Sequence, residues 1–142
     1  MLTARPALPH RQHQAFAYHR VQIDSQIDGG ATPHRLVSML FDGYFEAIAQ
    51  AKGAIADRNI EAKGKAISKA AAIVEEGLRA SLDLRGGGKI AHDLNELYLY
   101  VARKLTWANL KSDVAALDEC ASLIKPVQEA WNTIAPGQKA PN

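Results

Sequence analysis

The sequence contains few of the residues that disulfide bonds, β-sheets and membrane-spanning helices require. Cys120 is its only cysteine, which excludes an internal disulfide bond and is typical of a reducing compartment. Aromatic residues make up 6% of the chain, and runs of β-branched residues are almost absent. No apolar run approaches the roughly 20 residues that cross a bilayer, and the N-terminus has no apolar signal core. These absences predict a cytoplasmic protein without membrane insertion.

The charge of the chain is nearly balanced, and its composition favours helices. Lysine and arginine number 17 against 15 acidic residues, a net charge of +2 that indicates no nucleic-acid partner. The 142 residues are 47% hydrophobic, enough for one domain with a core. Alanine is abundant beside leucine, isoleucine, lysine and glutamate, all of which favour helix.

Four stretches repeat apolar residues at helical spacing and are separated by short breaks. Thr32 and Pro33 form a good helix start, because a capping hydroxyl precedes a proline in the first turn. Asn59 is expected to cap the second helix, residues 85–88 to break the chain, and residues 111–112 to form a corner. Short connections make sequential helices antiparallel. The pattern predicts an all-α fold, an antiparallel up-down-up-down four-helix bundle.

Composition divides the chain into four parts. Residues 1–14 contain two prolines and several basic groups, and are predicted to form a disordered arm. Residues 15–30 repeat apolar side chains at helical spacing before two glycines, and are predicted to form a short mobile helical segment. Residues 31–136 are assigned to the bundle and residues 137–142 to a frayed tail.

The stretch SLDLRGGGKIAHDL, residues 81–94, has the glycines and lysine of a phosphate-binding loop. Such a loop needs a preceding strand, the spacing GxxxxGK[ST] and a hydroxyl for the metal ion. Here a predicted helix precedes the glycines, and Ile90 follows Lys89 where serine or threonine is needed. We interpret the glycines as a helix C-cap, where glycine adopts the left-handed conformation without strain.

No set of catalytic or metal-ligating side chains emerges from the sequence. His92 has Glu96 one turn further on, but the Glu-x-x-His pairs of a di-iron bundle and the further ligands of a zinc site are missing. The three histidines among residues 10–19 cluster near the N-terminus, where nothing would orient them. Cys120 lacks a close basic neighbour and is predicted to be a core residue. We therefore expect no enzyme activity, no metal and no cofactor.

Two packing features of the predicted helices are unusual. Gly43, Gly53, Gly64 and Gly77 lie inside helices, at a cost of about 0.5–1 kcal/mol each relative to alanine. They indicate either close helix–helix approach or a soft, grooved surface. The first and third helices are also apolar beyond the roughly three of every seven positions that a bundle core needs. This surplus indicates either a cover for the N-terminal segment, a partner groove or an oligomer interface.

Four segments, taken in order, resemble the FliS family of flagellin export chaperones. They are ATPHRLVSMLFDGYFEAIAQA (31–51), SLDLRGGGKIAHDLNELYLYV (81–101), ANLKSDVAALDE (108–119) and EAW (129–131). The resemblance implies a cytoplasmic helical bundle that binds the disordered C-terminal region of flagellin in apolar grooves. It also implies that the bundle prevents premature polymerisation and delivers flagellin to the flagellar type III export gate. Whether a co-chaperone or a flagellar regulator also binds stays open.

The resemblance also assigns roles to individual residues. Tyr18, Val21 and Ile23 are expected in an N-terminal cap that occupies a groove when no client is bound. Asp42, expected near a helix start, and Asn109, expected at a helix end, match polar positions of the family and are interpreted as structural. Roughly half of the groove positions are expected to be plain core. The expected groove residues are Leu36, Leu40, Phe41, Tyr44, Ile48, Leu94, Leu97, Tyr98, Val101 and Leu105.

The chain departs from the family pattern in two places, and the residues also allow a second function. Tyr44 and Phe45 are bulkier than the residues usual after the glycine, which alters the expected groove width. Pro126 lies inside the fourth helix, where it removes a hydrogen bond and predicts a bend or a restart. The second hypothesis is a small regulatory or adaptor bundle for a folded partner. Deleting residues 1–27 separates the two, because a removable cap leaves the four helices folded.

Overall fold

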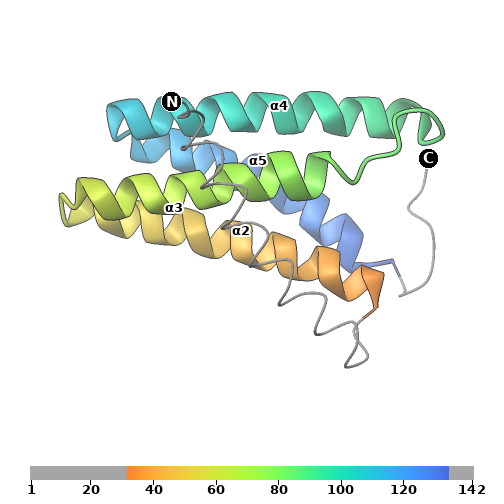
Figure 1. Cartoon of the computed structure of the whole chain (residues 1–142), viewed down its shortest axis with the longest axis horizontal. Coiled ribbons are helices and arrows are strands. Elements are labelled where there is room, and N and C mark those ends of the chain that lie inside the picture. Colours follow the sequence, from red (N-terminus) through yellow and green to blue (C-terminus); the bar gives the residue numbers. More distant parts are fainter. Residues whose placement is uncertain (1–31, 135–142) are drawn as a thin grey trace, which may run out of the picture.

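The computed structural model describes residues 32–134, and this part of the chain is helical without a strand. Figure 1 shows four long helices, the second of which continues into a short π-helix. The predicted arm, N-terminal cap and tail lie outside the described residues. No helix within residues 32–134 is long and apolar enough to cross a membrane. The elements are α2 (Pro33–Ala56), α3 (Ile60–Ala72), η1 (Ile73–Arg79), α4 (Gly88–Lys111) and α5 (Val114–Asn132).

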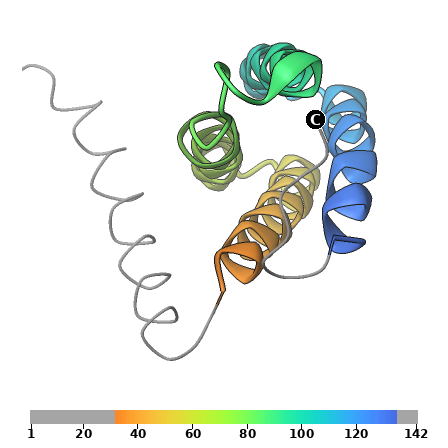
Figure 2. The ribbon, with the colours of Figure 1, turned by 90° about the vertical axis from the view of Figure 1, so that its right-hand side faces the viewer.

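The helices pack as the antiparallel bundle that the sequence predicted. Each helix contacts the next one in the chain, and α5 closes the ring against α2 (Figure 2). All four helices contribute to one apolar core. We call the end that holds the α2–α3 and α4–α5 turns the closed end, and the end where α2 begins and α5 finishes the open end (Figure 1). The largest wholly buried side chains are Tyr44, Ile73, Leu105, Leu117 and Ile124.

Side-chain caps explain where three of the helices begin. The Oγ1 atom of Thr32 accepts a hydrogen bond from the Arg35 N–H at 3.0 Å, and Pro33 follows it, as predicted. The Oδ1 atom of Asn59 accepts from the Ala62 N–H at 3.0 Å, which confirms the second predicted cap. Asp113 caps α5 in the same way. The caps satisfy amide groups that have no partner inside the helix.

The glycine stretch does not cap the second helix, and this prediction was wrong. The helix ends at Arg79, seven residues before the first of the three glycines. Gly88, with a φ of +63°, instead begins α4. A glycine with left-handed backbone is therefore present, but it lies at the start of α4 and not at the end of the preceding helix.

Asp83 organises the turn that precedes α4. Its Oδ1 atom accepts hydrogen bonds from the Arg85 and Gly86 N–H groups at 3.1 and 2.9 Å. Its carbonyl oxygen accepts from the Gly87 N–H at 2.8 Å. A Cβ atom at Gly86 or Gly87 would lie 2.7 or 2.5 Å from Asp83 atoms, so the turn requires glycine at both positions. The carboxylate and the carbonyl oxygen of Asp83 already accept from these amides, which leaves them unavailable for a phosphate.

The second helix changes to a π-helix at Ile73, which the sequence analysis did not predict. Close packing of α2 on this segment accounts for two of the four helical glycines. A Cβ atom at Gly77 would lie 3.1 Å from Leu40 Cδ1, and one at Gly43 would lie 3.3 Å from Ile73 Cδ1. The other two helical glycines have open space at the Cβ position. Close approach therefore explains Gly43 and Gly77 only.

Lys63 is the buried charged residue of the described part, with 7% of its surface exposed. Its Nζ atom donates hydrogen bonds to the Asn109 carbonyl oxygen at 2.9 Å and to Ser112 Oγ at 2.7 Å. Carbonyls at the C-terminus of a helix carry partial negative charge, so the end of α4 stabilises the ammonium group. Asn109 lies at a helix end as predicted. Asp42 was wrongly placed near a helix start, because α2 begins at Pro33 and Asp42 lies in its middle.

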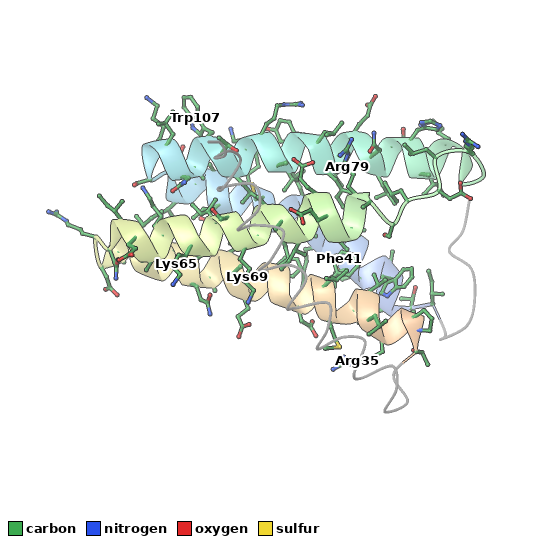
Figure 3. All side chains as sticks on the ribbon, in the orientation of Figure 1. Arg35, Phe41, Lys65, Lys69, Arg79 and Trp107 are labelled. Atoms are coloured by element: carbon green, nitrogen blue, oxygen red, sulfur yellow. The ribbon has the colours of Figure 1, made fainter. Side chains whose placement is uncertain are left out.

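We expect Lys63→Met to lower the free energy of unfolding by about 1–3 kcal/mol, because it removes two hydrogen bonds from a charged donor, one to the half-buried Asn109 carbonyl and one to Ser112 Oγ. Urea denaturation measures the change. Lys65→Met is the matched control, since Lys65 is exposed on the same helix (Figure 3). The control should stay within about 0.5 kcal/mol of the unsubstituted protein. Equal stability of both variants would contradict a stabilising role for the Lys63 contacts.

Candidate functional site

The structure separates the ten predicted groove residues into two groups. A wholly buried side chain cannot touch a partner unless the helices separate, so direct contact falls to the half-buried group of Leu36, Leu94 and Leu97. The predicted cap residues Tyr18, Val21 and Ile23 lie outside the described residues. The buried group, exposed by at most 9%, contains Leu40, Phe41, Tyr44, Ile48, Tyr98, Val101 and Leu105.

Helix α5 is joined to α2 along its whole length. The contacts run from the closed end to the open end and include an ion pair, hydrogen bonds, a cation–π contact and a ring stack. Their antiparallel register holds α5 against α2 at every turn. In order along α5, the pairs are Asp118 with Lys52 (2.6 Å), the Cys120 carbonyl with the Tyr44 hydroxyl (2.8 Å), Lys125 with the Phe45 ring, Gln128 with Asp42 (3.3 Å), and Trp131 with His34.

The hydrogen bonds and the ion pair between α5 and α4 are confined to the first half of α5. Glu119 accepts a hydrogen bond from the Tyr100 hydroxyl at 2.6 Å and pairs with Lys104 at 3.4 Å. The Cys120 thiol lies 3.9 Å from the Val101 carbonyl oxygen. Within residues 32–134, no hydrogen bond or ion pair joins α4 to α5 beyond Cys120. Figures 1 and 2 show the consequence, because α5 leaves α4 and finishes beside the start of α2.

A strip of incompletely buried apolar side chains lies where the two helices part. The contact of Tyr100 with Glu119 sets the antiparallel register, which brings the preceding turns of α4 opposite the following turns of α5. On both helices the apolar residues recur at spacings of three or four, so they form one face. We call this strip the α4–α5 seam. It consists of Ile90, Leu94 and Leu97 from α4 and Leu123, Val127 and Trp131 from α5.

The sequence analysis did not assign four of the six seam residues to the groove, namely Ile90 of α4 and all three from α5. The spacing of Leu123, Val127 and Trp131 at i, i+4 and i+8 is visible in the sequence, but it also fits a residue set that is simply core. The path of α5 decides whether these three residues lie in the core or at the seam, and that path depends on the contacts of α5 with α2. No local pattern in the fourth helix reports that path.

The core beneath the seam is neutral and unreactive. Burial raises the pKa of the Cys120 thiol to about 12 and the pKa of Tyr98 to about 12. Burial also raises the pKa of Tyr44, whose hydroxyl donates to the Cys120 carbonyl. The hydrogen bond from Tyr100 lowers the pKa of the Glu119 carboxyl, which therefore stays charged at the closed end of the seam. Cys120 is a core residue, as predicted.

The fold and the seam define a helical bundle whose surface suits an amphipathic helix from another polypeptide. The family described as Flagellar protein FliS matches residues 14–138 of this chain. The chain therefore belongs to the FliS family, as its ordered sequence segments predicted.

Characterised relatives agree with this assignment over most of the chain. It is 42% identical over 120 residues to the flagellar secretion chaperone FliS of Salmonella typhimurium, covering 84% of this chain and 88% of the relative. It is 40% identical over 118 residues to the flagellar secretion chaperone FliSB of Pseudomonas aeruginosa, covering 83% and 92%. The flagellar secretion chaperone FliS of Bacillus subtilis is 30% identical over 101 residues, covering 71% and 74%.

The buried thiol should make the fold sensitive to alkali. The folded state keeps a proton on Cys120 up to a pKa of about 12, whereas the unfolded state loses it well below that value. Stability is therefore fully present below the unfolded pKa and is lost as the pH rises toward the folded one. Between pH 7 and 10 we expect Cys120 to contribute a loss of about 1.5–2 kcal/mol in the free energy of unfolding.

Urea denaturation at the two pH values measures this loss, with Cys120→Ala as the comparison. The variant lacks the titrating group, so its stability should fall less between pH 7 and 10, even if it is less stable at both. The same pH dependence in the two proteins would contradict the assignment.

Proposed function

We propose that this protein is a cytoplasmic flagellar export chaperone that binds the disordered C-terminal region of flagellin. Binding prevents premature polymerisation, and the complex is delivered to the flagellar type III export gate. Family membership and the chaperone names of the relatives support the proposal. Holding and releasing a polypeptide needs no catalytic group and no cofactor, so we propose no enzyme activity.

The observation that carries the proposal is the α4–α5 seam. An amphipathic helix presents apolar side chains at i, i+3, i+4 and i+7, and the seam offers opposed aliphatic rows at the same spacings. Docking such a helix would remove the half-exposed side chains from water. Fully burying one aliphatic side chain contributes about 1.5–3 kcal/mol, so a few of them offset the ordering entropy of a disordered client.

The ten groove residues of the family resemblance then divide into two roles. We propose that Leu94 and Leu97 touch the client directly and that Leu36 lies where the client reaches the open end. Tyr98, Val101 and the other buried members support the seam from below. Val127 and Leu123 supply the opposite wall, which the resemblance did not assign. In this proposal Tyr18, Val21 and Ile23 form the cap that covers the groove without a client.

Calorimetric titration with a peptide from the C-terminal end of flagellin from the same organism tests the proposal. We expect saturable one-to-one binding with a negative heat-capacity change, because apolar surface is buried. Circular dichroism should show a gain in helix, since the peptide folds as it docks. No heat and no helix gain at tens of micromolar peptide would contradict the proposal and favour an adaptor for a folded partner.

Substitution of one seam residue locates the binding surface. Leu97→Ser should weaken peptide binding at least tenfold, because a truncated apolar contact at the centre of an interface costs about 1–2 kcal/mol or more. Leu110→Ser is the matched control, since Leu110 lies on the same helix at the closed end and is 74% exposed. The control should bind like the unsubstituted protein. Equal losses in both variants would place the client elsewhere on the bundle.

A further inference from the structure

Two side chains join the first turn of α2 to the last turn of α5 by three contacts. His34 Nε2 lies 2.9 Å from the Trp131 carbonyl oxygen, and Trp131 Nε1 donates to the His34 carbonyl oxygen at 3.2 Å. The rings stack with centroids 4.8 Å apart and planes 10° apart. Since a carbonyl oxygen only accepts, the His34 proton is assigned to Nε2. We call this pair the His34–Trp131 latch.

The latch acts on the part of α5 that its own backbone holds least firmly. Pro126 has no N–H group, so it cannot donate to the Ser122 carbonyl, although α5 continues through it to Asn132. Within residues 32–134, the side-chain hydrogen bonds that tie α5 after Pro126 to another helix are those of the latch and the Gln128–Asp42 pair. Gln128 and Asp42 meet at an exposed site, where such a contact adds little.

Trp131 belongs to the latch and to the α4–α5 seam at once. While its ring is stacked on His34, the last turn of α5 is held beside α2 and away from the start of α4 (Figure 1). Val127 and Ile90 then remain partly exposed on the two walls of the seam. Without the latch, burial of these aliphatic side chains would favour movement of the end of α5 toward α4.

We propose that the His34–Trp131 latch sets the width of the α4–α5 seam and so keeps it open for a client helix. His34 and Trp131 are positioning residues in this account, and the inference rests on the proposed function of the seam. A closed seam buries its own apolar side chains, so only the open state can bind a client helix. The apparent dissociation constant then rises by the inverse of the open fraction.

His34→Ala tests the inference, because it removes the stack and one hydrogen bond without substituting any residue of the seam. If the open fraction falls to about one tenth, the flagellin peptide should bind about tenfold more weakly. In stopped-flow measurements the association rate constant should fall about tenfold, and the dissociation rate constant should not change. A merely loosened fold would instead speed dissociation.

Two further variants complete the experiment. Lys52→Ala removes another α2–α5 contact, the ion pair with Asp118 at the closed end, and should leave both rates unchanged. Trp131→Phe keeps an aromatic ring for stacking but deletes the N–H donor to His34, so it should lie between the unsubstituted protein and His34→Ala. This variant also tests the latch if His34→Ala fails to fold.

The outcomes distinguish the latch from the function on which it rests. Normal association of the peptide with His34→Ala would overturn the latch, while peptide binding by the unsubstituted protein would still support the chaperone proposal. Absence of binding by the unsubstituted protein would overturn both. Slow association in Lys52→Ala as well as His34→Ala would also overturn the latch, because any loosening of α5 would then have the same effect.

Discussion

Helix α5 is bonded to α2 along its whole length, whereas within residues 32–134 its side-chain bonds to α4 stop at Cys120. A four-helix bundle normally buries the apolar face of each helix against two neighbours. Here the second half of α5 follows one neighbour and departs from the other. The resulting gap in the side-chain bonds leaves Leu94, Leu97 and Val127 only half-buried, although all three pack against the core. The candidate site is thus a direct consequence of how one helix is attached.

Contacts elsewhere in the bundle hold the helices together although α5 is attached unequally to its two neighbours. At the closed end, Lys63 ties α3 to the end of α4, and Glu119 joins α4 to α5. Beneath the seam, burial raises the pKa of Tyr98 and of the Cys120 thiol, so both groups stay neutral. The core under the seam therefore presents apolar contacts and no ionised group. Polar contacts at the closed end and incompletely buried apolar side chains toward the open end fit the proposed binding of a disordered polypeptide. Wide contact of this kind need not produce extreme affinity.

The sequence was sufficient for the four helices, because Thr32, Asn59 and the apolar spacings act locally and report helix starts and faces directly. It was insufficient wherever distant residues decide the outcome. The glycines before α4 were placed at the wrong helix end, since the carboxylate of Asp83 organises that turn. Val127 became a seam residue only through the contacts of α5 with α2. Patterns in one helix do not record such partners.

The most direct measurement is a methyl NMR spectrum of the leucine, isoleucine and valine side chains, recorded during titration with unlabelled flagellin C-terminal peptide. We predict large shift changes at Leu94, Leu97, Leu123 and Val127, which line both walls of the seam. Ile60 and Leu110, each 74% exposed at the closed end, should keep their positions. Changes confined to the closed end, with the seam resonances unmoved, would contradict the claim that the parting of α4 and α5 creates the client site.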